Sequence, residues 1–350
     1  MEEQKRITSH DVARRAGVSR TTVSLVLNNK SEVSQISTKT VQRVMRAAQD
    51  LGYVPNAAAQ ALVSKRAGVL GLILSRNHHQ ITSDMFLTQV VDGLMQVAHQ
   101  NNMRVLLDVV EDPGDQQSYQ RLIHARQVDG ILISGPREDD HALQTLMDIR
   151  FPTVLMGSLP GNNFYSVDVD NVLAARMATQ HLIKLGHQRI ACITNAKPSF
   201  TAAADRLKGY RMALVANQLQ ADDRLERFGD FDPQSGYRAM QGLLTVQPRP
   251  TAVFVASDVV AFGAISAILQ AGLRIPQDIA VVGFDDLPLS AFYQPHLTSI
   301  HLPIVDLALT GGEILIQLIN GKKPDQKNIL LNTHLVIRES CGAHLPGAPG

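Results

Sequence analysis

The stretch ITSHDVARRAGVSRTTVSLVL, residues 7–27, carries two short helix signals separated by a tight turn. Thr8 followed three positions later by Asp11 is a capping box, which marks the start of a first helix. Gly17 ends this helix, because glycine readily adopts the left-handed backbone that a tight connection needs. Ser19 supplies the cap of a second helix only two residues later. This spacing predicts a helix-turn-helix unit.

The second helix is expected over residues 20–27, with Val23, Val26 and Leu27 as its buried face. The outward face is small, rich in hydroxyl groups and lightly charged: Arg20, Thr21, Thr22, Ser24, Leu25 and Asn28. Arginine pairs with guanine edges, and hydroxyls and amides hold phosphates, so this surface suits the major groove of DNA. The alternative is a generic three-helix bundle in which these residues only cover the surface.

A third helix, capped by Ser37, is expected from about Thr38 to Leu51. We expect five of its side chains to face inward: Val41, Val44, Met45, Ala48 and Leu51. Residues 1–65 hold ten Lys and Arg against five Asp and Glu, while the remainder holds 23 basic and 27 acidic residues. A basic head over residues 1–54 on a mildly acidic body favours a partner that is a polyanion.

The segments ITSHDVARRAGVSRTTVSLVLNN and LGYVPNAAAQAL closely resemble the head of the lactose/galactose repressor family of bacterial transcription regulators. The resemblance implies that the second helix enters the major groove and that Arg20 and Thr21 read bases. A third reader falls on Leu25, which can touch a thymine methyl group but cannot hydrogen-bond a base. The remaining DNA contacts are assigned to Thr8, Ser19, Thr22, Ser24, Asn28, Thr40, Asn56, Ala59 and Leu62.

The stretch PNAAAQALVSK, residues 55–65, contains good helix formers but is too short to be a stable helix alone. Pro55 separates it from the third helix, and Asn56 can serve as its N-cap. The resemblance implies a hinge over residues 55–66, which forms a helix when two copies pair in the operator's minor groove. Leu62 matches the residue wedged into the central base step. An inert alanine-rich linker is the alternative.

Beyond the hinge, short apolar runs alternate with longer amphipathic ones. The expected strands cover residues 69–74, 103–109, 129–134, 152–156, 189–194, 251–256 and 279–284. Among the helices between them are Asp84–Asn101, Asn171–Leu185 and Val259–Ala271. Continuous apolar strands that alternate with helices predict an α/β fold of doubly wound parallel sheets, and the length fits two lobes. We expect ligands at the carboxyl ends of the strands.

Four further segments resemble landmarks of the same family, in the same order: LIKLGHQRIACI, DRLKGYRMAL, VASDVVAFGAI and AVVGFDDLPLSAFYQPHLTSI. The resemblance implies a core like that of periplasmic sugar-binding proteins, with two lobes, three crossovers and an effector in the cleft. We assign this core to residues 67–340 and expect a disordered tail over residues 341–350.

A sugar needs polar clamps on its hydroxyls and an aromatic face against its apolar side. Arg206 and Asp285 match the clamp positions of the family, and Phe231 matches its stacking position. Phe86, which follows the first strand, is expected to form a second wall. Ser257 stands where sugar-binding relatives often have Asn, so the identity of the ligand stays open.

Several of these assignments have structural alternatives. Arg206 and Asp285 can form an ion pair that bridges the lobes, and Phe86 and Phe231 can be core residues. Asp258 and Asp286 are expected to cap helices or brace loops.

No metal or cofactor is expected. His78 and His79 are adjacent and therefore point apart, so we expect solvated loop residues.

The combined pattern predicts a transcription regulator, most often a repressor in this family, that binds a palindromic operator as a homodimer. Its effector is expected to be a sugar or sugar derivative, with nucleosides or purines as the alternative. A sugar-binding protein and an enzyme that uses Asp285 and Asp286 are the remaining alternatives. The N-terminus MEEQKRITSH lacks the apolar region of a secretion signal, and Cys192 and Cys341 stand far apart. We therefore expect a cytoplasmic protein without a membrane span.

Overall fold

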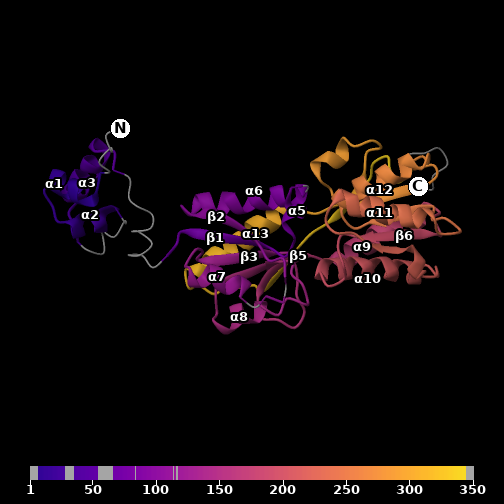
Figure 1. The fold of residues 1–350 in the computed structure, drawn as a ribbon, viewed down its shortest axis with the longest axis horizontal. Helices are drawn as coiled ribbons and strands as arrows, with labels where there is room; N and C mark the ends of the chain where they lie inside the picture. Colours follow the sequence, from indigo (N-terminus) through magenta and orange to yellow (C-terminus); the bar gives the residue numbers. More distant parts are fainter. Residues whose placement is uncertain are drawn as a thin grey trace. The chain divides into compact units, whose positions relative to one another are not determined.

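The computed structural model describes residues 7–27, 35–53, 66–82, 84–112, 114–115 and 117–343, without the side chains of His78 and His79. The chain divides into two compact units, Met1–Gly68 and Val69–Gly350 (Figure 1). The first contains the head and the second the core. None of the described helices is long and apolar enough to cross a membrane.

The described part of the head holds three helices around a small core. They are α1 (Ser9–Ala16), α2 (Arg20–Leu27) and α3 (Thr38–Asp50). The side chains buried between them are Val12, Ala13, Ala16, Val23, Val26, Val44, Ala47 and Ala48. The prediction that Met45 faces inward is wrong, because its side chain is 53% exposed. Ala47, which lies three residues after Val44 and therefore on the same side of α3, takes the inward position instead.

The expected caps of these helices are present. Thr8 and Asp11 form the capping box of α1, and Gly17 ends this helix with a φ of 64°. The backbone N–H of Thr22 donates to Oγ of Ser19 over 3.0 Å at the start of α2. The turn chemistry of the helix-turn-helix is therefore confirmed.

The first lobe of the core is a six-stranded parallel sheet in the order β11-β5-β4-β3-β1-β2. Its strands are β1 (Val69–Leu74), β2 (Arg104–Val109), β3 (Gly130–Ser134), β4 (Thr153–Met156), β5 (Tyr165–Val169) and β11 (Asn328–Leu331). Its helices are α5 (His78–Ile81), α6 (Met85–Gln100), α7 (Ser118–His124), α8 (Leu143–Asp148) and α13 (Ile304–Ile319). Successive side chains of β1 serve opposite faces: Leu72 joins the cluster of α6 and α13, and Ile73 joins that of α7 and α8.

The second lobe has a sheet in the order β12-β10-β9-β8-β6-β7, which is parallel except for the pair β10 and β12. Its strands are β6 (Ile190–Thr194), β7 (Glu226–Phe228), β8 (Ala252–Val255), β9 (Ala280–Asp285), β10 (Thr298–His301) and β12 (His334–Val336). Its helices are α9 (Asn171–Lys184), α10 (Thr201–Ala216), α11 (Pro233–Leu244) and α12 (Asp258–Gln270), with single turns η1 (Asp223–Leu225) and η2 (Pro288–Ala291). Figure 1 shows α11 and α12 on one face of this sheet and α9 and α10 on the other.

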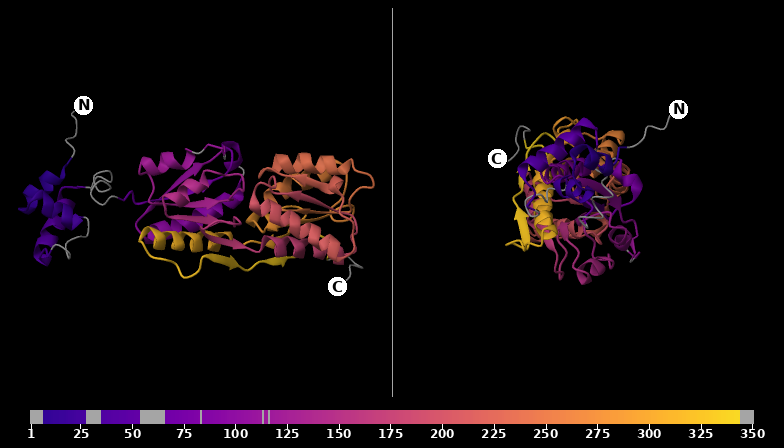
Figure 2. Two further views of the ribbon diagram at one scale, coloured as in Figure 1. Left: turned by 90° about the horizontal axis from the view of Figure 1, so that it is seen from below. Right: turned by 90° about the vertical axis from the view of Figure 1, so that its left-hand side faces the viewer.

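The lobes are joined where the chain passes from β5 to α9, from β10 to α13, and from β11 to β12. Figure 2 shows the last of these segments running along both lobes. The three crossovers and the doubly wound parallel sheets are therefore confirmed.

Each of the seven expected strands is present, with bounds that differ by at most two residues. The pattern missed β5, β7, β10, β11 and β12, of which the last four are short and partly polar. The prediction of a disordered tail from residue 341 is wrong at its start. Cys341 is only 1% exposed and packs in the core of the second lobe.

Glycines allow α11 and α12 of the second lobe to pack backbone against backbone. A Cβ added to Gly236 in α11 would lie 1.9 Å from the carbonyl oxygen of Val260 in α12. A Cβ added to Gly263 in α12 would lie 1.7 Å from the carbonyl oxygen of Pro233 in α11. Neither contact can be relieved by turning a side chain, so this crossing requires glycine.

We expect Gly236→Ala to lower the free energy of unfolding by about 1–3 kcal/mol, because α11 and α12 must separate. Gly242→Ala in the same helix is the matched control, since its Cβ would meet only a side-chain atom of Arg227 at 3.4 Å. That change should raise the free energy of unfolding by up to about 1 kcal/mol through helix propensity. Urea unfolding measures both, and equal effects would contradict the proposed packing.

Candidate functional site

A cavity lies between the two lobes, at the carboxyl ends of their strands. Phe86 lines it from the first lobe, and Arg206, Phe231, Ser257 and Asp285 line it from the second. The structure therefore brings all five predicted effector residues into one lining.

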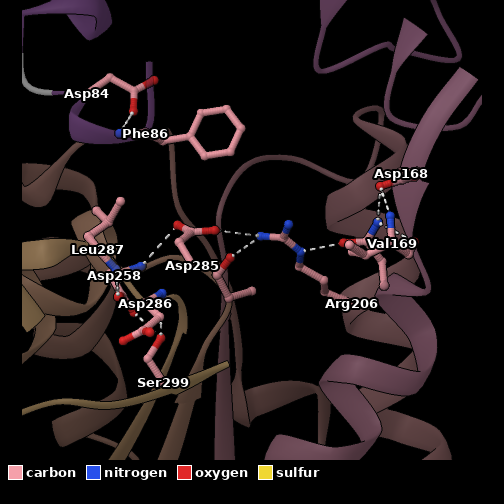
Figure 3. Close-up of polar contacts among 12 residues, drawn as sticks. Asp84, Phe86, Asp168, Val169, Arg206, Asp258, Asp285, Asp286, Leu287 and Ser299 are labelled. Atoms are coloured by element: carbon pink, nitrogen blue, oxygen red, sulfur yellow. Dashed lines mark hydrogen bonds and ion pairs between the residues drawn. The ribbon is translucent and has the colours of Figure 1, made fainter. Parts of the chain in front are cut away.

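Arg206 of α10 is held by polar contacts at Nε and Nη1 and by a ring against the plane of its guanidinium group (Figure 3). Its Nε donates to Oδ1 of Asn171 over 2.8 Å, and its Nη1 donates to the carbonyl of Ala256 over 2.7 Å. The Cζ atom lies 3.7 Å from the centroid of the Phe284 ring, and Nη1 lies 3.7 Å from Oδ1 of Asp285. Burial lowers the pKa of Arg206, and the charge of Asp285 opposes this shift.

The ion pair of Arg206 and Asp285 is present, but it does not bridge the lobes. Both residues belong to the second lobe, Arg206 in α10 and Asp285 at the end of β9. Asp285 ends β9 with a φ of 114°, a conformation that is rare outside glycine and typical of functional sites. Burial raises the pKa of Asp285 to about 6, and the charge of Arg206 and a hydrogen bond from Ser257 oppose that rise.

Asp258 braces the loop after β9, as expected. Its Oδ2 accepts hydrogen bonds from the backbone N–H of Leu287 and from Oγ of Ser290, at 2.9 and 2.5 Å. Its Oδ1 accepts a hydrogen bond from Oγ of Ser299 over 2.7 Å. Burial and the nearby charge of Asp285 raise its pKa to about 8.

Asp286 points to other partners. Its carboxylate lies 2.6 Å from Nη2 of Arg338 and 3.0 Å from Nδ1 of His301. The prediction that Asp258 and Asp286 brace loops is confirmed, and consecutive Asp285 and Asp286 do not face one substrate.

Phe231 both packs in the protein and lines the cavity. Its ring meets the ring of Phe200 at 4.9 Å and 79°, and its backbone has a φ of 58°. The N–H of Phe231 donates to the carbonyl of Asn195 over 2.9 Å, which holds this strained position. The interpretations as core residue and as cavity wall are therefore both valid for Phe231. Phe86 is partly buried against the core of its lobe and also lines the cavity.

The sequence interpretation missed five polar residues of the lining: Arg76, Asp84, Ser134, Asp168 and Asn195. Asp168 lies near the end of β5, where Oδ1 accepts hydrogen bonds from the side chain of Asn171 and from the N–H of Val169, at 3.0 and 2.8 Å. Burial raises its pKa to about 6. Position at a strand end could have identified Asp168 and Arg76, but the strand before Asp168 was itself not recognised.

His78 and His79 lie in the one-turn helix α5 rather than in the expected loop, and their side chains are outside the described residues. Within the described part of the chain, no three His, Cys, Asp or Glu residues are grouped to hold a metal ion.

The predicted DNA-binding surface is exposed on the head as far as it is described. Thr8, Ser19, Arg20 and Thr21 are exposed, and Thr22, Ser24, Leu25 and Thr40 are partly exposed. Asn28, Asn56, Ala59 and Leu62 lie outside the described residues. The first turn of α2 therefore presents one charged and several hydroxyl side chains to a partner.

Asp168→Asn should change how stability depends on pH. Because the pKa of Asp168 rises from 3.8 to about 6 on folding, the folded chain holds a proton that the unfolded chain releases between these values. The contribution of this group to the free energy of unfolding is therefore present below pH 4 and falls by up to about 3 kcal/mol as pH rises through 6. Urea unfolding at several pH values should show this loss in the parent chain and not in the variant.

Asp278→Asn is the control for that comparison. Asp278 is paired with Arg274 at the surface, and this partner lowers its pKa. A parent chain and Asp168→Asn variant with the same pH profile would contradict the burial of an ionisable Asp168.

Residues 8–56 match the family described as bacterial regulatory proteins, lacI family, and residues 179–341 match the periplasmic binding protein-like domain. The HTH-type transcriptional regulator CelR of Thermobifida fusca is 35% identical over 343 residues, which cover 97% of this chain and 100% of CelR. The ribose operon repressor of Escherichia coli strain K12 is 35% identical over 339 residues, which cover 95% and 99% of the two chains.

Two solved structures resemble nearly the whole chain. The complex of CelR with cellobiose is 33% identical with a TM-score of 0.73, and the match covers 96% of this chain and 100% of CelR. The Lac repressor dimer bound to operator and the anti-inducer ONPF is 33% identical with a TM-score of 0.82. That match covers 96% of this chain and 99% of the other.

Proposed function

Because the chain belongs to the lacI family of bacterial regulatory proteins, we propose that it is a repressor whose operator affinity is controlled by a small sugar bound between its core lobes. The observation that carries the sugar assignment is the shared lining of Arg206, Asp285 and Phe231. Two charged groups fixed by the protein and one aromatic ring suit a ligand with hydroxyls on its edge and C–H groups on its face. The relative CelR has been solved with cellobiose, a ligand of this class.

The head supplies the DNA contacts in this proposal. The N-terminal turn of α2 exposes Ser19, Arg20 and Thr21, which suit phosphate oxygens and base edges. One head covers little DNA, so two copies are needed for a specific and tight contact with a palindromic operator. The Lac repressor structure is itself a dimer bound to operator. Since the target is chromosomal DNA, the protein acts in the cytoplasm.

The crossovers allow the cavity to control the head. A ligand that contacts both lobes favours one arrangement of the lobes, and the first lobe continues N-terminally into residues 55–66. We propose that this segment is the hinge that forms a helix on DNA, with Leu62 in the central base step. Operator and effector must then change each other's affinity by the same factor.

An enzyme is the weaker proposal. Asp258 and Asp286 are engaged with loop groups, and Asp285 is paired with Arg206. The relatives are transcription regulators. We therefore propose that the cavity binds a ligand without transforming it.

Asn195→Ala tests the sugar site. Oδ1 of Asn195 is buried in the lining and has no hydrogen-bond partner among the described residues, so its removal breaks no such bond of Oδ1 within the protein. We expect the affinity for a bound sugar to fall about five- to tenfold, because one hydrogen bond is lost. Thermal shift with monosaccharides, cellobiose and nucleosides identifies the ligand class, and calorimetry measures the affinity.

Asn217→Ala, at the end of α10 and outside the lining, is the control and should leave the affinity unchanged. Stabilisation by nucleosides alone would contradict the sugar proposal and support a nucleoside effector. An unchanged affinity in Asn195→Ala would place the ligand elsewhere.

Arg20→Ala tests the DNA-reading surface. On an operator selected from random sequence, we expect a loss of affinity of about tenfold or more, because one bidentate base contact disappears. Binding to random DNA should fall much less. Arg15→Ala is the matched control, since Arg15 is paired with Asp50 at 3.7 Å on the other helices of the head. Equal losses of affinity for operator and random DNA would show that Arg20 contacts phosphates and does not read bases. An affinity of the parent chain for random DNA that does not fall with salt would contradict the proposal that the head binds DNA.

A further inference from the structure

Arg76 places a buried positive charge in the cavity beside the aromatic wall. It follows β1 by two residues, and only 7% of it is exposed. Its Nη1 forms an ion pair with Oδ2 of Asp84, the N-cap residue of α6. Its Cζ atom lies 4.0 Å from the centroid of the Phe231 ring and 5.7 Å from that of Phe86. The guanidinium therefore lies against Phe231 at the distance of direct stacking.

This contact joins the two lobes. Arg76 and Asp84 belong to the first lobe, and Phe231 precedes α11 of the second. A similar contact lies next to it, where Cζ of Arg137 from the first lobe is 4.7 Å from the ring of Phe200 in the second. Because Phe200 also meets Phe231 edge to face, the two arginines and two phenylalanines form one connected group, which we call the clasp.

Only one arginine of the clasp lies in the cavity. Arg76, Phe200 and Phe231 line it, and Arg137 does not. A sugar that stacks on Phe231 needs the ring face at about the distance that the guanidinium now takes. Ligand and guanidinium therefore compete for the same surface.

We propose that Arg76 covers the ring of Phe231 in the effector site and is displaced when an effector stacks there. This inference rests on the proposed function, since it presumes an effector with an apolar face. It assigns Arg76 a role in selecting ligands: only a molecule whose face replaces the guanidinium on the ring gains access.

The surroundings of Arg76 permit such a displacement. Its Nε has no hydrogen-bond partner among the described residues, so leaving the ring breaks no bond there. Its ion-pair partner Asp84 lies in the same lobe and is held at the start of α6 by the N–H groups of Phe86 and Leu87. The guanidinium can therefore leave the ring of the other lobe and stay paired with this carboxylate. Burial lowers the pKa of Arg76 to about 10, which leaves the group charged at neutral pH and the cation–π attraction intact.

Displacement also removes a contact between the lobes. Through its contact with Phe231, Arg76 holds the first lobe against the second, and a ligand that displaces Arg76 takes over this position. Arg137 and Phe200 are outside the exchange, together with the backbone bond from Glu138 N–H to the carbonyl of Ser199 at 2.9 Å. The effector thus replaces the contact of Arg76 with Phe231 and leaves the contact of Arg137 with Phe200 in place.

The decisive variant is Arg76→Ala in the full chain, with Arg137→Ala as the matched control. Calorimetry with cellobiose, and with any other sugar that stabilises the parent chain, gives the affinities. We expect Arg76→Ala to bind about tenfold more tightly, because no buried cation–π contact has to be broken. Arg137→Ala should not bind more tightly. An affinity of Arg76→Ala equal to or below that of the parent would overturn the proposal, as would an equal gain in Arg137→Ala.

A second measurement needs no ligand. The chain contains no Trp, so Phe231→Trp introduces a single fluorescent reporter at the covered ring. Acrylamide should quench this tryptophan more strongly when Arg76→Ala is added, and not when Arg137→Ala is added. Unchanged quenching by Arg76→Ala would overturn the proposal. If no sugar binds to the parent chain or to Arg76→Ala, the proposed sugar site fails, and the quenching result alone decides whether Arg76 covers the ring.

Discussion

The buried guanidinium of Arg206 is the constraint around which the cavity is built. A charge in this position is strongly unfavourable unless hydrogen bonds and opposite charges compensate it. Here the compensation comes from Asn171, Ala256 and Asp285, which belong to elements far apart in the sequence. Each of these elements is fixed relative to α10 because it supplies a hydrogen bond or an opposite charge to the guanidinium group of Arg206. The ends of β8 and β9 and the start of α9 are thereby held at the same point.

This network also reaches the junction of the lobes. Asp168 near the end of β5 accepts a hydrogen bond from Asn171, which in turn accepts one from Arg206 (Figure 3). Asp168 belongs to the first lobe and Arg206 to the second, and Asn171 begins the helix after the crossover between them. A ligand that hydrogen-bonds Arg206 therefore acts on groups that set the geometry of a crossover. We infer that the cavity and the arrangement of the lobes are coupled through these two hydrogen bonds.

The sequence predicted the parts of the fold that local chemistry determines. Runs such as VLGLIL identify buried parallel strands, and the caps of the head identify its helices to within a residue. Short edge strands such as Glu226–Phe228 and His334–Val336 could not be predicted, because their pairing depends on neighbours distant in the sequence. The predicted effector residues came from the family resemblance, except Phe86, which was predicted from its place after the first strand, and all five line one cavity in the structure. Arg76 was missed because nothing near it in the sequence shows that a ring of the other lobe lies 4.0 Å away.

The two arginines of the cavity, Arg76 and Arg206, differ in the contacts that hold their guanidinium groups. Nε and Nη1 of Arg206 both donate to protein acceptors, its ring partner Phe284 lies in its own lobe, and moving it would leave several buried groups unpaired. Arg76 has an unpaired Nε and, in its own lobe, one ion-pair partner and the ring of Phe86. From the other lobe only the ring of Phe231 and the charge of Asp285 act on it among the described residues. The energy needed to move a buried charge grows with the number of partners it leaves, so a ligand can exchange places with Arg76 far more easily than with Arg206. Arg206 therefore maintains the site in both states, while Arg76 is the group whose position differs between them.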